Sequence, residues 1–244
     1  MTAHIEEPAE GTLIWKYLDL AKYLALLKSH CLHLAATTEF VDRYEGDIGT
    51  AQRRLLIEKH GRPVYDQAMR RIDTLRKRTY VSSWTENEFE SDAMWRIYTG
   101  ASYGVAVRTT YGRLKATLPR PEEGLVYYCG RVSYVNFKTH LLELDDYCLP
   151  YFYKRRTFEH EREVRVILQD TRPRAEGPGR KISLRPGQIN ELVMSVHLSP
   201  GAPLWFGELV RDVNKDYGLD RDPIPSALDE EPLSESFGDL EASP

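Results

Sequence analysis

The stretch that decides the fold is residues 161–168, which read EREVRVIL. Within it, Val164–Leu168 is rich in β-branched residues and gives the strongest strand signal in the chain. Weaker strand patterns lie on both sides of it, and they outnumber the helical patterns between them. The sequence therefore predicts an α+β fold, with a mixed or mainly antiparallel central sheet and flanking helices.

The other elements follow from hydrophobic spacing and capping residues. Further strands are expected over 13–17, 32–35, 80–84, 104–107, 126–128, 132–135, 181–184 and 192–198. Helices are expected after the caps Asp19 and Ser91, over 50–78 with an interruption at 61–63, over 141–152, and from Pro203 onward. The last helix is expected to face inward with Leu204, Trp205, Leu209 and Val213, and Met94, Trp95 and Tyr98 are expected in the core.

The net charge is unevenly distributed along the 244 residues. The formal net charge is −4, but residues 1–10 carry −3 and residues 221–244 carry −6, which leaves +5 on residues 11–220. A hydrophobic fraction of 41% is enough for a core and excludes global disorder. A mildly basic body between acidic ends favours a phosphate-bearing ligand.

Three regions are expected along the chain. Residues 1–10 form an acidic flexible start, and residues 229–244 form an acidic disordered tail. Residues 11–228 form a single α+β domain with a basic helical insert at about 50–78. No apolar run approaches the roughly 20 residues that a membrane-spanning helix needs, and no signal peptide is visible, so a cytoplasmic protein without membrane contact is expected.

Several short motifs occur in a characteristic order. They are Lys16-Tyr17, FVDRYE at 40–45, SSWT at 82–85, MWRIY at 94–98, Gly104-Val105, Lys154 and FEHEREVR at 158–165. In this combination the chain resembles the bacterial family called domain of unknown function 2971, over about Leu13–Leu198. Members are discussed near phage-defence and abortive-infection genes, so the resemblance implies a toxin or effector role.

Glu161 and Glu163 flank one residue at the entrance to the strongest strand. In a strand, side chains two residues apart project from one face roughly 7 Å apart, so both carboxylates can enter one cavity. We assign Glu163 to stabilising an oxocarbenium-like centre through a ribose hydroxyl and Glu161 to activating an acceptor. Glu159 and Glu161 form an equally spaced pair, so the register stays open.

Three elements occur in the order of the motifs of mono-ADP-ribosyltransferases: Lys16, then Ser83 with Thr85, then Glu161 with Glu163. The chain is similar to those enzymes in this series, although they usually carry Arg or His where this chain has Lys16. The similarity implies an ADP-ribosyltransferase-like fold and cleavage of the nicotinamide–ribose bond of NAD. It implies transfer to a macromolecular or nucleotide acceptor, or NAD glycohydrolase activity, without a tightly bound metal. The residues assigned to dinucleotide binding are Lys16, Tyr17, Ser83, Trp84, Thr85 and Arg165.

Each of these assignments has a structural alternative. The glutamates could pair with neighbouring arginines on a solvated surface, where such pairs add little stability. The SSWT segment could be an ordinary strand end with a Ser/Thr turn, and Lys16 could extend from a sheet edge. The sequence does not identify the acceptor, and the oligomeric state is unknown.

The basic insert supports a function of another class. Between Arg53 and Arg78 there are nine Lys or Arg against Glu58, Asp66 and Asp73. A positive helical face attracts phosphates, so the chain could be a non-enzymatic module, such as an antitoxin, that binds nucleic acid or a partner. A weaker alternative is a nucleotide or nucleic-acid hydrolase that uses the carboxylates with a transient divalent ion.

Overall fold

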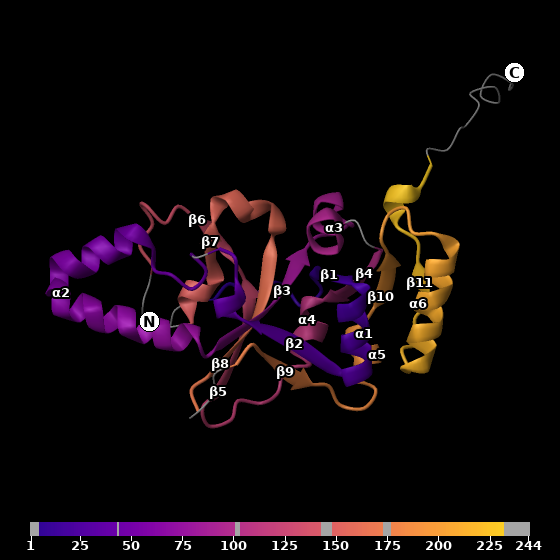
Figure 1. The fold of residues 1–244 in the computed structure, drawn as a ribbon, viewed down its shortest axis with the longest axis horizontal. Helices are drawn as coiled ribbons and strands as arrows, with labels where there is room; N and C mark the ends of the chain where they lie inside the picture. Colours follow the sequence, from indigo (N-terminus) through magenta and orange to yellow (C-terminus); the bar gives the residue numbers. More distant parts are fainter. Residues whose placement is uncertain (1–4, 43, 101–102, 143–147, 173–176, 232–244) are drawn as a thin grey trace, which may run out of the picture.

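The strongest strand signal forms β8 (Glu163–Asp170), which is buried along its whole length. The structure is a computed structural model and describes residues 5–42, 44–100, 103–142, 148–172 and 177–231. Within these residues, nine strands form one sheet that is antiparallel at every pairing except one, and helices pack around it (Figure 1). The α+β architecture with a mainly antiparallel central sheet agrees with the sequence.

The other elements are named as in Figure 1. The strands are β1 (Leu13–Asp19), β2 (Cys31–Ala36), β3 (Thr79–Glu86), β4 (Gly104–Thr110), β5 (Leu125–Arg131), β6 (Ser133–Val135), β7 (Tyr153–Arg155), β9 (Gly179–Ser183), β10 (Ser195–Leu198) and β11 (Pro223–Ile224). The α-helices are α1 (Leu20–Ser29), α2 (Gly49–Arg76), α3 (Asp92–Thr99), α4 (Tyr111–Lys115), α5 (Gln188–Leu192) and α6 (Leu204–Asp216). The 3₁₀-helices are η1 (Thr37–Glu39), η2 (Leu149–Phe152), η3 (Arg156–Glu161) and η4 (Ala227–Asp229).

The sheet divides at β3. The path β11-β10-β4-β1-β3-β2-β9 gives the main order, while β8 pairs with β3 and β5 pairs with β8. One edge of β3 pairs with β8 from Thr79 to Thr85. On its other edge, β2 pairs at the start of β3 and β1 pairs at its end, at Thr85 and Glu86. Residues 82–84 of β3 lie between the segment that pairs with β2 and the segment that pairs with β1, where these two strands diverge.

The two faces of the sheet are covered differently. One face packs on the largest apolar cluster, which includes side chains of α1, α4, α5 and α6. The opposite face carries two smaller clusters, one beneath α3 and one beneath η2. Because alternate strand residues point to opposite faces, Glu163 and Arg165 lie on this second face while Val164 and Val166 enter the main core.

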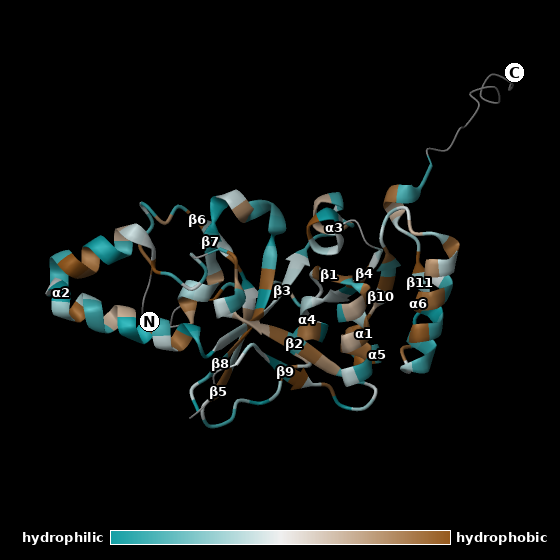
Figure 2. Cartoon of the chain, viewed as in Figure 1, coloured by the Kyte–Doolittle hydropathy of each residue, from teal (hydrophilic) through white to brown (hydrophobic). Residues whose placement is uncertain are grey.

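The basic insert forms α2, which projects from one end of the sheet as two helices (Figure 1). They are interrupted as the sequence predicted, because Gly61 has a φ of 76° and Pro63 follows it. Hydrophilic residues cover most of both helices (Figure 2). Leu56, Met69 and Ile72 pack on a small cluster around Phe137, which attaches the insert to the rest of the chain.

Both predicted helix caps are present. The Asp19 carboxylate accepts a hydrogen bond from Lys22 N, and the Ser91 hydroxyl accepts one from Met94 N. Each bond satisfies a backbone N–H that the first helical turn leaves free, which is worth about 1 kcal/mol. The caps thus define where α1 and α3 begin.

Three expectations are wrong in detail. In α6 the buried side chains include Phe206 and Val210, whereas Leu204 is 90% and Trp205 57% exposed. Apolar residues occur on several sides of this helix, so its spacing alone does not define the inward face. The strand expected over 192–198 begins only at Ser195, because α5 continues to Leu192.

The third wrong expectation is the helix over 141–152. Residues 141–142 are not helical and only η2 follows, with Pro150 near its start, while residues 143–147 lie outside the described part. The structure places residues 5–10 beside the domain, with Glu6 O accepting from Arg131 N. No helix of the described residues is long and apolar enough to cross a membrane.

Candidate active site

The two candidate glutamates meet at the beginning of β8, but they do not belong to one strand. Glu161 ends η3, and Glu163 begins β8. Between them Arg162 has a φ of 44°, a left-handed conformation that turns the chain. The expectation of an extended Glu-x-Glu segment is therefore wrong, and the tight turn brings the carboxyls together instead.

Lys154 connects the two carboxyls. Its Nζ donates to Glu161 Oε2 at 2.8 Å and to Glu163 Oε1 at 2.6 Å. It also lies 3.4 Å from Glu45 Oε1. Lys154 comes from β7, whose pairing with β6 places Tyr134 opposite it, and the Tyr134 hydroxyl accepts from Glu163 N at 2.8 Å. The β6–β7 ribbon thus closes over the start of β8.

Arg165 pairs with two of these carboxyls, those of Glu163 and Glu45. Its Nε donates to Glu163 Oε2 at 2.7 Å, and its Nη1 lies 2.7 Å from Glu45 Oε2 and donates to Tyr151 O at 2.7 Å. The side chain is only 1% exposed. Buried charges of this kind are tolerated when they are paired and hydrogen-bonded. We call Glu45, Glu161, Glu163, Lys154 and Arg165 the ion cluster.

The ion cluster contains three carboxyls and two cations, which explains the protonation states of its members. Burial opposes ionisation of Glu163, but Arg165 and then Lys154 overcome it and hold the pKa of Glu163 well below its usual range. Burial and hydrogen bonding to Glu163 raise the pKa of Glu161 to about 7, against the pull of Lys154. The pair therefore exchanges one proton near neutral pH.

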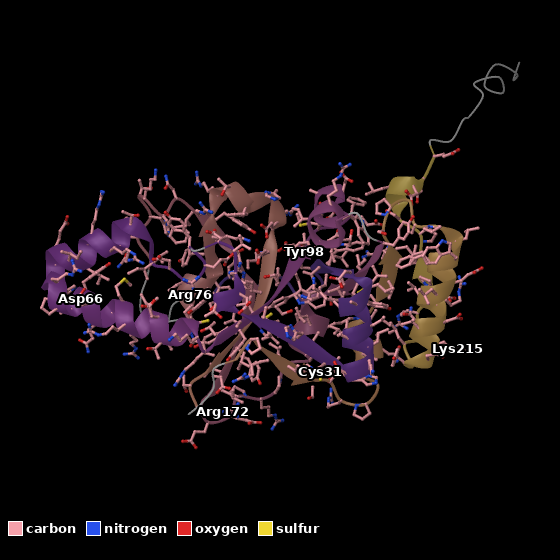
Figure 3. The ribbon with its side chains drawn as sticks, viewed as in Figure 1. Cys31, Asp66, Arg76, Tyr98, Arg172 and Lys215 are labelled. Atoms are coloured by element: carbon pink, nitrogen blue, oxygen red, sulfur yellow. The ribbon has the colours of Figure 1, made fainter. Side chains whose placement is uncertain are left out.

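The surroundings of the ion cluster combine aromatic and basic side chains. Tyr98, in the last turn of α3, is labelled in Figure 3 and is 38% exposed, which corrects its expected place in the core. Burial, and then the charges of Glu163 and Glu161, raise its pKa. The Phe158 ring centroid is 4.7 Å from Lys154 Nζ. Arg155 stacks on Phe158 and pairs with Asp42.

Three of the six residues predicted to bind a dinucleotide lie with the ion cluster. Thr85 is the register partner of Glu163, and Ser83 is the partner of Arg165, so their side chains share one face of the sheet. Thr85 is buried and Ser83 is half-buried. Arg165 belongs to the cluster itself, where protein carboxylates and a carbonyl occupy its guanidinium.

Lys16 and Trp84 lie on the other face. The Lys16 ammonium occupies the division in the sheet, where it donates to Ser82 Oγ and to Ser83 O at 3.0 Å each. It also contacts the ring of Trp84, which is 1% exposed in the main core. Burial lowers the pKa of Lys16 to about 8. Lys16 thus supplies donors to polar groups of β3 where the neighbouring strands diverge.

Tyr17 packs beneath α3. Its hydroxyl accepts from Ser91 N at 2.9 Å, and its ring meets Trp95 edge-on at 4.9 Å. Burial raises its pKa to about 12. Of the six residues, Lys16, Tyr17 and Trp84 are therefore engaged in packing and in holding β3 and α3.

Sequence reasoning missed the role of Lys154, which joins all three carboxyls. The signal available was its place in a basic run, Lys154–Arg156, a few residues before the glutamates. Glu45 lies in a loop far earlier in the chain, so its contact with Arg165 depends on the tertiary fold. Among the described residues, no group of three or more His, Cys, Asp or Glu is arranged to hold a metal ion.

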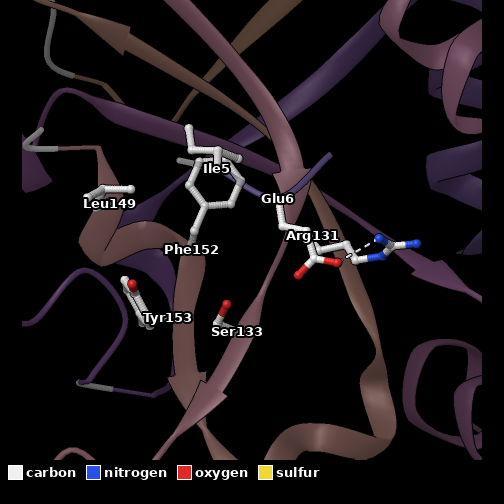
Figure 4. A pocket seen from close by; sticks show the side chains of 7 residues that line it. All are labelled: Ile5, Glu6, Arg131, Ser133, Leu149, Phe152 and Tyr153. Carbon is white, nitrogen blue, oxygen red and sulfur yellow. Dashed lines mark hydrogen bonds and ion pairs between the residues drawn. The ribbon is translucent and has the colours of Figure 1, made fainter. Parts of the chain in front are cut away.

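A cavity of about 290 Å³ lies beside the β6–β7 ribbon (Figure 4). Its lining residues are Ile5, Glu6, Arg131, Ser133, Leu149, Phe152 and Tyr153. Ser133 and Tyr153 are register partners and alternate with Tyr134 and Lys154, so the cavity lies behind the ribbon and not over the ion cluster. Arg131 is bound there by Glu6 and Glu86, which leaves this cavity apart from the paired carboxyls.

Comparison with known proteins identifies no family for this chain. No protein-family model matches it, and no curated protein matches it. Among solved structures, it is similar to DarT from Thermus sp. 2.9 in complex with ADP-ribosylated ssDNA, at 13% identity and a TM-score of 0.40. The match covers 91% of this chain and 97% of that chain. A likeness this weak does not assign an activity.

Proposed function

We propose that the chain is an ADP-ribosyltransferase-like enzyme that cleaves the nicotinamide–ribose bond of NAD and modifies a macromolecular or nucleotide acceptor. The observation that supports this proposal is the carboxyl pair of Glu161 and Glu163, whose environments separate their pKa values. Paired carboxyls with separated pKa values are typical of acid–base and glycosyl-transfer sites.

In the proposed reaction each of the two carboxyls has a separate role. As the bond from ribose C1′ to nicotinamide breaks, its electron pair leaves with the now neutral nicotinamide, and positive charge develops on the ribose. The ionised Glu163 stabilises that charge. The acceptor hydroxyl or amine then bonds to C1′, and its proton passes to the ionised form of Glu161.

The exposure of the two carboxyls favours this division. The Glu161 side chain is 10% exposed and the Glu163 side chain only 3%, so an acceptor reaches Glu161 more readily. Glu163 is fixed by Lys154 and Arg165, which suits a group that acts by its charge. Arg155, Arg156 and Arg162 are half-buried or exposed nearby and can contact phosphate groups of the ligand.

The test is incubation of the purified chain with NAD, with and without cell lysate, followed by measurement of nicotinamide release and acceptor labelling. We expect Glu163→Gln to reduce nicotinamide release about 100-fold, the effect of removing one electrostatic stabiliser. Glu161→Gln should reduce acceptor labelling by a similar factor. The matched control is Glu159→Gln, an exposed glutamate outside the ion cluster, which should leave both unchanged.

Two outcomes contradict the proposal. One is a folded wild-type chain that releases no nicotinamide and labels no acceptor. The other is a loss with Glu159→Gln that equals the loss with Glu163→Gln, which would place the active pair one register earlier. Nicotinamide release without a labelled acceptor would make the chain an NAD glycohydrolase, with water as the acceptor.

We also propose that the chain belongs to the domain of unknown function 2971 family and acts as a defence effector in a bacterial cell. The motif series from Lys16 to Arg165 supports this proposal. Expression in a bacterial host should slow growth, and Glu163→Gln should relieve that effect. Equal growth with the wild type and the variant would argue against the effector role.

A second candidate function is nucleic-acid or partner binding through α2. The observation that favours it is the projection of α2 from the sheet with Arg54, Lys59, Arg70 and Lys77 exposed. Binding to single- or double-stranded nucleic acid should weaken with salt and after the double reversal Arg54→Glu and Arg70→Glu. It should be unaffected by Glu163→Gln. Retained binding after the reversals would contradict it.

A further inference from the structure

A second group of polar side chains lies across α3 from the ion cluster. Ser195 and His197 occupy β10, and Glu90 lies just before α3. Ser195 and Trp15 both pair with Arg108 in register, so Ser195, His197 and Trp15 share the sheet face that α3 covers. The group uses none of the residues assigned to NAD cleavage.

The three side chains are arranged in sequence from hydroxyl to carboxylate. Ser195 Oγ lies 3.0 Å from His197 Nε2. The other ring nitrogen, His197 Nδ1, lies 3.3 Å from Glu90 Oε1, within ion-pair distance of the carboxylate but without a hydrogen bond to any described residue. The imidazole packs edge-on against Trp15 at 4.8 Å, which fixes the plane of the ring. His197 is 8% exposed, and Ser195 is partly exposed, so the hydroxyl is the accessible end.

Glu90 is held in place by neutral donors. Its Oε2 accepts from Trp95 Nε1 at 3.0 Å and from Ser226 Oγ at 2.6 Å, and its Oε1 accepts from Ala227 N at 3.1 Å. Burial opposes its ionisation, but the neighbouring His197 imidazole and then the donors of Ser226, Ala227 and Trp95 lower its pKa to about 2. A fixed, ionised carboxylate at Nδ1 orients an imidazole and stabilises its protonated form.

We propose that Ser195, His197 and Glu90 form a second catalytic site, in which Ser195 is a nucleophile toward carboxylic esters that carry a negative charge. The charge preference comes from Arg108, the cross-strand partner of Ser195, whose guanidinium lies 5.5 Å from the Trp15 ring. Its buried Nε has no hydrogen-bond partner within the described residues. This inference does not depend on the proposed NAD chemistry.

The reaction follows the usual order of acyl transfer. Ser195 Oγ attacks the ester carbonyl as its proton moves to His197 Nε2, and the C–O bond to the leaving alcohol breaks as that proton passes to the alcohol oxygen. Water then attacks the acyl-serine, with His197 accepting and returning a proton, and releases the acid. The net reaction is ester plus water to acid plus alcohol.

The test uses a fluorophosphonate probe and intact-mass spectrometry on the full chain. An activated serine bonds to phosphorus and releases fluoride, so one adduct at Ser195 is expected. Ser195→Ala should abolish it, and His197→Ala should slow labelling about 100-fold or more. Ser183→Ala, on an exposed strand position, is the matched control and should label normally. Glu163→Gln should also label normally, which separates this proposal from NAD cleavage.

Arg108→Leu provides a second measurement. The wild type should hydrolyse the nitrophenyl monoester of succinate faster than nitrophenyl acetate, and Arg108→Leu should remove that preference while labelling persists. A folded wild type that takes no label overturns the proposal, as does an adduct that persists in Ser195→Ala. Labelling at Ser195 that does not change in His197→Ala also overturns it, because a serine in a purely structural cluster gains no help from the imidazole.

Discussion

The ion cluster and the Glu90–His197–Ser195 group lie on one face of the same sheet. The pKa of Glu161 is raised in the first, whereas the pKa of Glu90 is lowered in the second. Glu161 has another carboxyl beside it, and burial with that neighbour raises its pKa to about 7. Glu90 is surrounded by neutral donors and one imidazole, which lower its pKa to about 2 against the effect of burial. Burial alone therefore does not determine the protonation state of a carboxyl, and its hydrogen-bond partners decide the direction.

The largest expected effect comes from removing a cation of the ion cluster. Arg165→Leu leaves Glu163 and Glu45 buried without their main partner, and breaking a buried ion pair from one side costs about 3–5 kcal/mol. Urea denaturation at pH 7 should show this loss in the free energy of unfolding. The exposed Arg62, paired with Asp66, is the control, and Arg62→Leu should change stability by less than about 1 kcal/mol.

Equal losses for Arg165→Leu and Arg62→Leu would contradict the role of the ion cluster in stability. The double variant Arg165→Leu with Glu163→Gln provides a further comparison, because it removes one of the stranded charges. It should recover part of the loss. A double variant less stable than Arg165→Leu alone would show that the carboxylate is not the source of the cost.

Much of the fold could be predicted from the sequence, because local signals and tertiary packing agree there. The β-branched run at Val164–Leu168, the caps Asp19 and Ser91, and the glycine at position 61 each impose a local conformation that the fold retains. The α6 face could not be predicted, because its apolar residues point in several directions and the neighbouring strands select which are buried.

The site was less predictable for a physical reason. Glu161 and Glu163 are close in the chain, so their proximity was expected, but the left-handed Arg162 between them could not be read from the sequence. Lys16 precedes a motif like that of the transferases, yet its ammonium bonds to β3 at the division in the sheet. That division results from the divergence of β1 and β2, a long-range property without a local sequence signal.

A medium-sized effect is expected in the pH dependence of stability. Burial and the neighbouring carboxyl raise the pKa of Glu161 to about 7, above the value of about 4.3 for an unfolded glutamate. The folded chain therefore binds this proton more tightly, and its contribution is full below about pH 4.3 and is lost as pH rises through 7. The free energy of unfolding should fall across this window, and Glu161→Gln should flatten the slope.

The reverse slope is expected for Glu90. Its pKa is lowered to about 2, so its contribution is present above about pH 4.3 and is lost as pH falls toward 2. The unfolding free energies of the wild type and Glu90→Gln should differ by a constant amount above about pH 4.3 and converge as pH falls toward 2, whereas those of the wild type and Glu161→Gln should be similar below pH 4.3 and separate as pH rises toward 7. A change in the difference from the wild type over the same pH range for both variants would show that the two glutamates do not differ in the way that their neighbours imply.

The smallest effect should come from removing one neutral donor of Glu90. Ser226→Ala deletes a hydrogen bond of 2.6 Å to Oε2, while Trp95 Nε1 and Ala227 N still donate to the same carboxylate. A hydrogen bond to a charged group contributes about 1.5–3 kcal/mol, and because two donors remain, the unfolding free energy at pH 7 should fall by about 1.5 kcal/mol. The acid limb of the curve of unfolding free energy against pH should shift to higher pH, because the carboxylate loses a donor that favours its ionised form. A loss as large as that of Arg165→Leu would mean that Glu90 depends on one partner, as the ion cluster depends on Arg165, and would remove the contrast between the two sites.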